Sequence, residues 1–537
     1  MALNSRIKVP LPEKGVIVAR RKGDVPRVYH VLETFRNEKG QPTNKRKLIG
    51  KLDEESGMLV PNDAYYEFYD AAAAVEELPE GKAVTAPLAE FLASRILEDL
   101  GASAMLEDAF GREDARSISL VAAYMLSRGN VMQGAADWCA ECVLGDGSIT
   151  SQSTSALFAG LTREKRMAFF RSWAASLAQS EYLAYDVTSV SSYSEGISDL
   201  EWGYNRDGER LPQLNLGMYL GRESGLPAFY RTYPGSIVDK SHLPYMMADN
   251  AEVGIGADGV TFVMDKGFCT TANVEYMSSE RYRYVIGVDG RHKATRQAIE
   301  SVRATVTSSA NRLPGGVHAQ RVHGRFYGAT SDLHVFFDDD LARRQRLDLY
   351  RRVDADREEL AQLSDLSGRD VKRLSRFHSI DVADDGSFSF AEDHAAVDAA
   401  AANSGFFCLL TNDGALSCAD VLAIYRDKDA IEKGFDELKN HLDMSRLRTH
   451  ADETTEGKVF CAFVSLIVVM HMQRELAQLM GKKNLTKKRV LAELEKAKVV
   501  TTASGKRLMN PLTRLQKDIL APFGVTEDDF KEFVATA

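Results

Sequence analysis

The order of the elements predicted from Tyr182 to Val288 constrains the fold of this 537-residue chain more than any other feature. Three short β-rich runs come first, and a Gly-containing turn at residues 221–225 joins the last two; the runs are LAYDVTSV, PQLNLGMYLG and LPAFYRTYPG. A helix, a strand, a second helix and a further strand follow, with the sequences SHLPYMMADNAEVG, GVTFVMD, TTANVEYMSSER and RYRYVIGV. An antiparallel meander that leads into parallel strands is the order of a ribonuclease-H-like α/β core.

The sequence before this core has two different patterns. Residues 15–60 alternate as three short strands separated by Gly, Pro and Asn; the strands are VIVAR, RVYHVLETFR and KRKLIGKL. From Ala71 to about Ser180, apolar residues recur at steps of three and four, as in Leu88, Leu92 and Ile96, which predicts helices without a strand.

Residues 291–400 interrupt the regular alternation. They contain a charged helix from about Asp340 to Phe377, an acid-rich loop at 381–398, and three strand-like pieces, VRATVTS, AQRVHGRFYGATS and LHVFF. The strand FFCLLTN and a long helix from Ala419 to His441 then resume a core-like pattern. We interpret 291–400 as an insertion within the core.

The predicted fold class is therefore α/β, with a ribonuclease-H-like core interrupted by an insertion domain. A basic β-rich segment and a helical domain precede the core, and a basic helical region follows it. The predicted boundaries are 1–70 for the β-rich segment, 71–180 for the helical domain, 181–290 for the first part of the core, 291–400 for the insertion, 401–480 for the second part of the core and 481–537 for the basic helical region.

The net charge of −10 argues against a nucleic-acid partner only until it is divided along the chain. Residues 1–51 carry +9, residues 482–517 also carry +9, and the rest carries −28. Basic clusters of this kind are typical of contact with a phosphate backbone, although a solvated charged surface has the same composition. The candidate DNA-binding residues in the two clusters are Arg20, Arg21, Lys22, Lys45, Arg46, Lys47, Lys482, Lys483, Lys487, Lys488 and Arg489.

Cysteine usage and apolar runs favour a cytoplasmic, nucleoid-associated protein. Six cysteines are few for this length, and MALNSRIKVPLPEKG lacks the apolar stretch of a secretory signal. Cys139 and Cys142 have metal-knuckle spacing, but no second pair follows nearby, which favours two helix-borne thiols. The most apolar run, Val459–Met472, is shorter than the ~20 residues of a membrane span and predicts a buried helix.

Three carboxylates are candidates for catalysis and metal binding. Asp186 and Asp265 end the strands LAYD and TFVMD, where ligand sites of α/β sheets often lie, and Glu432 lies on the helix after FFCLLTN. Carboxylate oxygens suit Mg²⁺, and a pair of metal ions activates a water or a 3′-hydroxyl and stabilises the leaving oxygen of a phosphodiester. The chain has many other acids, and the nearest alternatives are Asp249, Asp258, Asp289 and Asp436.

The predicted helix at 419–441 places a distinctive set of side chains together. Tyr425, Lys428, Glu432 and Lys439 follow one another at steps of 3, 4 and 7 residues, which keeps them on one helical face. Cations beside a metal-binding acid are suited to a polyanionic substrate. The alternative is a salt-bridged surface helix in which Lys428 and Glu432 form an ordinary i,i+4 pair.

With these motifs in order, the chain resembles the DDE transposases of bacterial and archaeal insertion sequences that have a β-rich insertion in the core. That group carries a Y-(2)-R-(3)-E-(6)-K signature, which Tyr425, Lys428, Glu432 and Lys439 match in spacing. DVTS at Asp186 and MDKGF around Asp265 resemble the strands of its first two acids. The stretch at 205–236 and the N-terminal KRKLIGKLDEESGMLVPND also resemble the family, so the likeness extends from about Arg27 to Arg474.

The chain departs from the family pattern at two points. Lys428 replaces the signature arginine, so it keeps the charge but loses the bidentate fork. Some relatives stack a tryptophan of the insertion on a flipped base, yet Trp138, Trp173 and Trp202 all lie outside 291–400. The sequence therefore does not support a hairpin intermediate, and the aromatic residues of the insertion either replace that tryptophan or form the core of the insertion; they are Phe326, Tyr327, Tyr350 and Phe377.

The resemblance implies a transposase that binds the terminal inverted repeats of its element, pairs the ends in a homodimer, cuts, and joins the 3′-OH to target DNA. Asp186, Asp265 and Glu432 would bind two Mg²⁺ ions, with Mn²⁺ as a substitute, while Tyr425, Lys428 and Lys439 would position phosphates. Two alternatives stay open from the sequence: a ribonuclease-H-like nuclease without strand transfer, and a non-catalytic domesticated DNA-binding protein.

Overall fold

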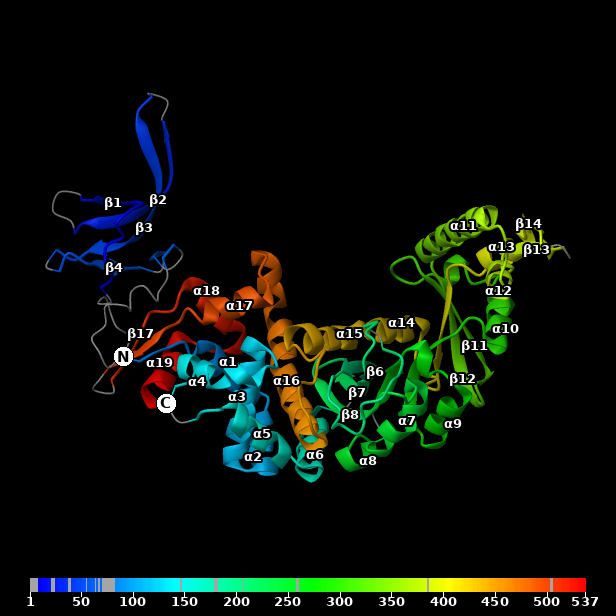
Figure 1. Ribbon diagram of the computed structural model, residues 1–537, viewed down its shortest axis with the longest axis horizontal. Helices are drawn as coiled ribbons and strands as arrows, with labels where there is room; N and C mark the ends of the chain where they lie inside the picture. The colour runs from blue at the N-terminus through cyan, green and yellow to red at the C-terminus, as the bar shows by residue number, and fades with distance from the viewer. Residues whose placement is uncertain are drawn as a thin grey trace.

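The chain is described here by a computed structural model, shown in Figure 1. The described residues are 8–20, 25–36, 40–54, 56–62, 64–65, 68–69, 83–144, 147–177, 182–205, 207–256, 260–383, 386–502 and 506–537.

A four-stranded antiparallel sheet forms the N-terminal part of the molecule and confirms the three predicted strands. Its strands are β1 (Val16–Ala19), β2 (Arg27–Arg36), β3 (Pro42–Leu52) and β4 (Leu59–Pro61), in that order across the sheet. The sheet has a small apolar cluster of its own, which contains Val9, Val28, Ile49, Leu59 and Tyr65. Figure 1 shows it at one end of the molecule, away from the largest sheet.

The described residues of the predicted helical segment, from 83 onward, form six α-helices and one strand that the apolar pattern did not indicate. The helices are α1 (Leu88–Asp99), α2 (Ala102–Phe110), α3 (Arg112–Arg128), α4 (Ala135–Cys142), α5 (Ser151–Gly160) and α6 (Arg163–Leu177). The strand β5 (Ala83–Thr85) pairs with β16 (Val499–Thr501), which in turn pairs with β17 (Arg507–Met509). A three-residue strand is too short to show a period, so its partner 414 residues later is what establishes it.

The C-terminal region therefore packs beside the first helices, as Figure 1 shows. Besides β16 and β17 it contains the helices α17 (Lys487–Leu494), α18 (Arg514–Leu520) and α19 (Glu527–Thr536). The prediction of a purely helical region was wrong, because two short strands complete the sheet begun by β5.

Eight strands form one mixed sheet in the order β11-β12-β15-β10-β9-β6-β7-β8. Their bounds are β6 Tyr182–Ser191, β7 Gln213–Gly221, β8 Pro227–Pro234, β9 Thr261–Met264, β10 Arg283–Val288, β11 His318–Phe326, β12 Ala329–Phe337 and β15 Phe406–Thr411. The first three form an antiparallel meander, and β9 and β10 run parallel to β6. All strands predicted between Tyr182 and Val288 are confirmed.

Helices cover both faces of this sheet (Figure 1). The predicted helices between its strands are confirmed as α7 (Asp239–Ala248), α8 (Asn250–Val253) and α9 (Thr271–Ser279). Short 3₁₀ turns occupy Met132–Gly134, Lys266–Phe268, Ser309–Asn311 and Ala521–Phe523.

The helix α16 (Asp452–Lys483) connects the sheet to the helical part, because it packs on α3, α5 and β8. Among the described residues it is the one helix long and apolar enough to cross a membrane, but 78% of its apolar window is buried inside the protein. It is a core helix, as the run at Val459–Met472 predicts.

The insertion is partly built into the eight-stranded sheet, because β11 and β12 pair through β15 with β10. Its other elements are α10 (Lys293–Val302), α11 (Asp339–Gln362), α12 (Gly368–Leu374), β13 (His378–Val382), β14 (Phe388–Glu392) and α13 (His394–Ala401). VRATVTS is the end of α10 and a series of turns, so the strand predicted there was wrong. The predicted charged helix is two helices, and the predicted acid-rich loop holds the β13–β14 hairpin and α13.

The helix predicted at 419–441 is also divided. It consists of α14 (Cys418–Arg426), α15 (Asp429–Asp436) and a π-helical segment (Glu437–His441). The capping box of Ser417 and Asp420 begins α14, and the chain turns at Asp427 and Lys428 before α15. A continuous helical face through all four signature positions is therefore not formed, because the turn and the π-helical segment change the rotation per residue.

Candidate active site

The pairing of β6 with β9 brings Asp186 and Asp265 side by side. The last paired residues of the two parallel strands are Tyr185 and Met264, and each aspartate is the next residue along its strand. Neighbouring strands lie about 4.8 Å apart, so the two backbones bring half-buried carboxylates to the same edge of the sheet. Asp265 follows the end of β9 as predicted, whereas Asp186 lies inside β6, which continues to Ser191, so the strand end predicted there was wrong. The register places the two residues next to each other.

Gly287 provides the space for a third group on the adjacent strand. Ile286 of β10 pairs with Met264 of β9, so Gly287 lies beside Asp265. A Cβ atom at Gly287 would stand 2.5 Å from the hydroxyl oxygen of Tyr425. The missing side chain thus leaves the room in which the Tyr425 hydroxyl donates a hydrogen bond of 3.0 Å to Asp265 Oδ1.

Lys428 and Glu432 lie on the other side of the α14–α15 turn. The Lys428 ammonium donates to Glu432 Oε1 at 3.0 Å. The two side chains differ in environment, since 9% of the Lys428 side chain and 61% of the Glu432 side chain are exposed. α15 packs on β6 and β7, and the charges of Asp186 and Asp265 act on the buried lysine in the turn before it, so the ammonium lies near the two aspartates.

The pKa shifts show that all three carboxylates act on the same two groups. Burial raises the pKa of Tyr425 well above its ordinary value, and the negative charges of Asp265, Glu432 and Asp186 raise it further. Burial acts to lower the pKa of Lys428, but the hydrogen bond to Glu432 and the charges of Asp186, Asp265 and Glu432 outweigh it, so the pKa is raised. Tyr425 stays protonated and Lys428 stays charged at neutral pH.

The donor set has the chemistry of a site for a hard cation. The three acids supply only carboxylate oxygens, which Mg²⁺ and similar ions prefer. Among the described residues, no group of three or more His, Cys, Asp and Glu side chains stands in a metal-holding arrangement. The buried Lys428 ammonium and the Tyr425 hydroxyl engage two of the carboxylates, and the exposed Glu432 has the freedom to change rotamer toward a metal ion.

The alternative acids named from the sequence are engaged elsewhere. Asp289 pairs with Arg291, and these hydrogen bonds lower its pKa to about 2. Asp249 pairs with Arg231 at 2.7 Å, and Asp436 accepts a hydrogen bond of 2.6 Å from Asn440. Asp258 lies outside the described residues.

Lys439 is separated from the other signature residues. Its ammonium donates to Asp207 at 2.6 Å in the segment between β6 and β7. In the same segment, Glu209 accepts a hydrogen bond of 2.6 Å from Arg446. The structure thus brings together Asp186, Asp265, Glu432, Tyr425 and Lys428, and it places Lys439 in a neighbouring ion pair.

The basic residues of the N-terminal sheet lie mostly on its surface. Lys45 and Arg46 are exposed, and Lys47 is half-buried. The Arg46 guanidinium lies 4.5 Å from the centre of the Tyr29 ring, and Arg20 pairs with Glu54 at 2.7 Å. Arg21 and Lys22 lie outside the described residues.

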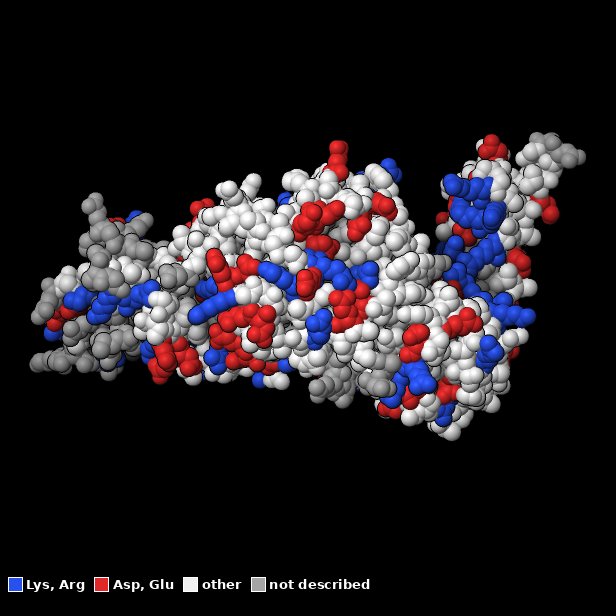
Figure 2. Space-filling view, turned by 90° about the horizontal axis from the view of Figure 1, so that it is seen from below, with Lys and Arg blue, Asp and Glu red and all other residues white. Residues whose placement is uncertain are grey.

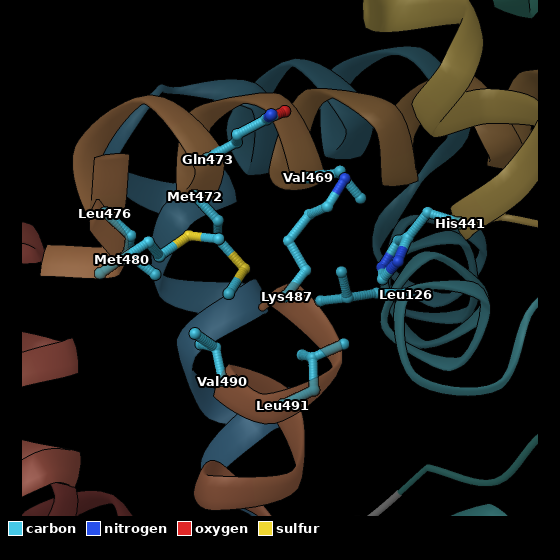
Figure 3. A pocket seen from close by; sticks show the side chains of 10 residues that line it. All are labelled: Leu126, His441, Val469, Met472, Gln473, Leu476, Met480, Lys487, Val490 and Leu491. Carbon is cyan, nitrogen blue, oxygen red and sulfur yellow. The ribbon is translucent and has the colours of Figure 1, made fainter. Parts of the chain in front are cut away.

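The C-terminal candidates divide into exposed and engaged side chains. Lys482, Lys488 and Arg489 are exposed, whereas Lys483 pairs with Asp518 at 2.7 Å. Lys487 pairs with Glu437, a buried acid of the π-helical segment. Figure 3 shows the Lys487 side chain extending from α17 through an apolar pocket toward the segment that carries His441.

A basic surface on the insertion was missed by the sequence argument, which treated the region as acidic. The α11 side chains Arg343, Arg344 and Arg352 are exposed and have no ion pair among the described residues. Figure 2 shows Lys and Arg gathered on the arm of the molecule that holds the insertion. The repeated Arg-Arg pairs of α11 were the available signal, and the acids of the same region concealed it in the charge sum.

The aromatic residues of the insertion are mostly core. Phe326, Tyr327 and Phe377 are buried. Phe377 belongs to a small apolar cluster of the insertion, as one of the two alternatives predicts, whereas Phe326 and Tyr327 belong to the large core cluster shared with the main sheet. Tyr350 on α11 is 47% exposed and lies beside the basic surface.

Comparison with known proteins identifies the class to which this fold and site belong. The profile of the transposase DDE domain family matches residues 178–468, which is just over half of the chain. The chain therefore belongs to the DDE transposase domain family, and it is a transposase whose chemistry is metal-dependent DNA cleavage and strand transfer.

Comparisons with solved structures and with curated proteins add less information about the family. Among solved structures, the chain is similar to that of piggyBac transposase in a cryo-EM synaptic complex with hairpin DNA, at 8% identity and a TM-score of 0.35. The alignment covers 79% of this chain and 76% of that chain. None of the curated proteins matches the chain.

Proposed function

We propose that this transposase cuts and joins the terminal inverted repeats of a bacterial or archaeal insertion sequence, with Asp186, Asp265 and Glu432 as its acid triad. The observation that carries the proposal is the register of β6 and β9, which makes the two aspartates neighbours at one sheet edge. The α15 acid is supported by its ion pair with Lys428, on which all three carboxylates act.

The strand order supports a ribonuclease-H-like core. Across this part of the sheet the strands follow the order β8-β7-β6-β9-β10. β6, β7 and β8 form an antiparallel meander, and β9 and β10 run parallel to β6. This is the arrangement that the order of elements predicts. It puts Asp265 at the carboxyl end of β9, where ligands of α/β sheets bind, and Asp186 beside it on β6, just past the last pair of the two strands.

The triad fits Mg²⁺, with Mn²⁺ as a substitute. A bound pair of metal ions supplies an activated water or 3′-hydroxyl and neutralises the leaving oxygen of the phosphodiester. Asp186 and Asp265 are held by two hydrogen-bonded strands, so their backbones need no rearrangement. Glu432 would complete the set from α15, since its exposed carboxylate is free to turn from Lys428.

Tyr425 and Lys428 have supporting roles. The protonated Tyr425 hydroxyl orients Asp265 Oδ1 by donating to it. Lys428 keeps a buried positive charge next to the acids, which attracts a phosphate of the substrate when Glu432 is turned away. As a point charge it binds a phosphate oxygen without the two-pronged geometry of arginine.

The partner is double-stranded DNA, bound as transposon ends and as target by a homodimer that pairs two ends. The exposed basic residues of the N-terminal sheet, of α11 and of the C-terminal region supply contacts to phosphates. Lys487 is less suited to contact a phosphate than its neighbours, because breaking its ion pair would leave the buried Glu437 carboxylate without a partner. Binding should weaken steeply as the salt concentration rises.

A single assay tests this function. Purified protein is incubated with labelled inverted-repeat DNA, target plasmid and Mg²⁺, and cut and joined products are separated. Cleavage with joining supports the transposase of an insertion sequence. Cleavage alone supports a nuclease, and binding without cleavage supports a non-catalytic protein.

The variant Glu432→Gln should lose cleavage while DNA binding stays near the wild-type level, because the amide keeps the shape but not the charge. Loss of a metal ligand removes several kcal/mol of transition-state stabilisation, a fall of more than about a hundredfold in rate. Asp436→Asn on the same helix is the matched control and should keep cleavage. If the Glu432 variant cleaves DNA and the Asp436 variant does not, Asp436 and not Glu432 is the third acid of the triad.

A further inference from the structure

A second polar groove lies between the helical part and the sheet, separate from the triad. It has a volume of about 720 Å³ and is formed by the 3₁₀ turn at 132–134, α5, the chain after β6, residues 446–451 and the start of α16. Among the residues that the structure describes, no Asp or Glu lines it, although acids outnumber bases in the chain. Its lining includes three cationic side chains, Arg446, Arg448 and Lys458, together with hydroxyl groups such as those of Ser155 and Thr454.

Lys458 is the feature of this groove that the fold alone does not explain. Its side chain is 2% exposed, and none of the hydrogen bonds or ion pairs of the described residues involves its ammonium group. Burial and the charge of Arg448 lower its pKa to about 8, against a smaller opposite effect of Asp443 and Cys461. An ammonium on a residue so largely removed from water, without a carboxylate partner, is poorly compensated, and an anion in the groove would compensate it.

The other two cations have carboxylate partners at the rim. Arg446 pairs with Glu209, and Arg448 donates to Asp443 at 3.0 Å. The Arg446 guanidinium also lies 5.5 Å from the centre of the Tyr193 ring, which is 75% exposed. The lining of the groove thus includes one nearly inaccessible lysine without a carboxylate partner and one exposed aromatic ring.

The groove continues from the strand that carries Asp186. The backbone N–H of Leu447 donates to the carbonyl of Ser191, the last residue of β6, and the next residues, Ser192 and Tyr193, line the groove. Six residues of extended chain separate Asp186 from Ser192, a distance of about 20 Å. That distance equals the rise of about six base pairs of duplex DNA.

We propose that this groove binds a backbone phosphate of DNA, with the Lys458 ammonium as its buried counter-charge. The proposal rests on the proposed function for its source of phosphate. Ammonium, guanidinium and hydroxyl donors suit the oxygens of a phosphodiester, and the exposed Tyr193 ring offers a face on which a base or sugar stacks. The size of the groove favours a polymer over a free phosphate ion.

The first test uses inorganic phosphate and requires no transposase activity. The melting temperature of the full chain is measured in phosphate and in chloride at equal ionic strength. Wild-type protein should melt higher in phosphate, because ligand binding to the folded state stabilises it. Lys458→Met should melt higher than wild type in chloride and should lose the gain in phosphate. Lys531→Met on α19 changes the charge equally and is the control that keeps the gain.

The second test uses duplex DNA and identifies the source of the phosphate. Lys458→Met should weaken DNA binding by on the order of tenfold and should reduce the slope of log K against log salt by about one. Arg448→Asn, at an exposed position with a positive φ of 54° that asparagine tolerates, should weaken binding in the same direction.

Distinct outcomes overturn the proposal. If Lys458→Met keeps both wild-type DNA affinity and the phosphate gain, the groove binds no phosphate. If only the phosphate gain is lost, the site takes a free anion and not DNA. Failure of the proposed function is distinguishable from both, because it appears as the absence of cleavage and joining by the wild-type protein.

Discussion

The missing side chain of Gly287 leaves room for the Tyr425 hydroxyl, and an added methyl group would displace it. A Cβ atom at Gly287 would stand 2.5 Å from the Tyr425 hydroxyl oxygen and 3.0 Å from the backbone nitrogen of Lys266. Gly287→Ala should therefore lower the free energy of unfolding by about 1–3 kcal/mol and displace Tyr425 from Asp265, which slows cleavage. Urea unfolding and the cleavage assay measure the two effects.

The same substitution in a Tyr425→Phe background is the control. Removal of the hydroxyl leaves the ring carbon at 3.2 Å from the added methyl group, a contact that small shifts relieve. The stability loss from Gly287→Ala should then shrink by on the order of 1 kcal/mol. Equal losses in both backgrounds would place the strain at Lys266 and not at Tyr425.

Lys458 should give the unliganded protein a characteristic pH dependence. Its pKa is about 8 in the folded state against 10.5 in the unfolded state, so the unfolded chain binds more protons between these values. Stability should therefore rise with pH across this window, by about 3 kcal/mol from this group. Arg448, Asp443 and Cys461 are the charged and titratable groups that act on it, and burial raises the pKa of the Cys461 thiol in the folded protein.

The measurement compares the wild type with Lys458→Met in phosphate-free urea titrations from about pH 8 to about pH 10.5. The variant should be more stable at the lower pH, and the difference should close as the pH rises. A difference that does not change with pH would mean that the lysine is paired in solution.

At the scale of elements, the crossing of α16 and α5 depends on a glycine. A Cβ atom at Gly457 would meet the backbone of Phe158, including its carbonyl oxygen. Gly457→Ala should destabilise the protein by about 2 kcal/mol or more even though alanine is the better helix former. Gly481→Ala in the same helix, where nothing lies within 4 Å, should instead be neutral or stabilise by ~0.5 kcal/mol. Chemical denaturation of both variants checks the opposite signs.

Elements with a clear period were predictable from the sequence, and elements defined by distant partners were not. The strands from Tyr182 to Val288 alternate with helices of ordinary length, and all are found. The strand β5 has three residues and exists because Val499 pairs with Thr85. Four of the seven residues of VRATVTS are β-branched, yet tertiary context makes it the end of α10 and turns.

The candidate site was also predictable only where the signal is local in the sequence. The strand end predicts Asp265 correctly, but Asp186 lies inside β6, and the register that makes the two neighbours appears only in the folded sheet. Helical spacing predicts one face for Tyr425, Lys428, Glu432 and Lys439, but the turn at 427–428 and the π-helical segment redirect the last of them to Asp207. The space left by Gly287 and the groove around Lys458 carry no sequence signal, because each depends on residues far apart in the chain.

At the scale of the whole molecule, the C-terminal region should be required for the helical part to fold. Val499, Leu512 and Phe530 are fully buried, and Phe530 packs on Phe91 of α1. A chain that ends after Lys483 leaves β5 without a strand partner and should lose at least about 5 kcal/mol of stability. Thermal unfolding and limited proteolysis of α1–α4 measure the loss.

Removal of the N-terminal sheet is the matched control for this truncation. Its apolar residues form a separate cluster, so a chain that begins at residue 83 should unfold at nearly the wild-type temperature. If both truncations had the same effect, the two ends of the chain would contribute equally to one cooperative unit.

The position of β15 between β10 and β12 has a consequence for synthesis on the ribosome. β10 ends at Val288 and its antiparallel partner begins at Phe406, so 118 residues are made before that edge is covered. At about 5–20 residues per second the nascent chain exposes the edge beside Gly287 for roughly 6–24 s. An open strand edge is a template for pairing with another chain. We therefore expect slower elongation between these strands to lower the yield of native protein before any effect on its chemistry appears.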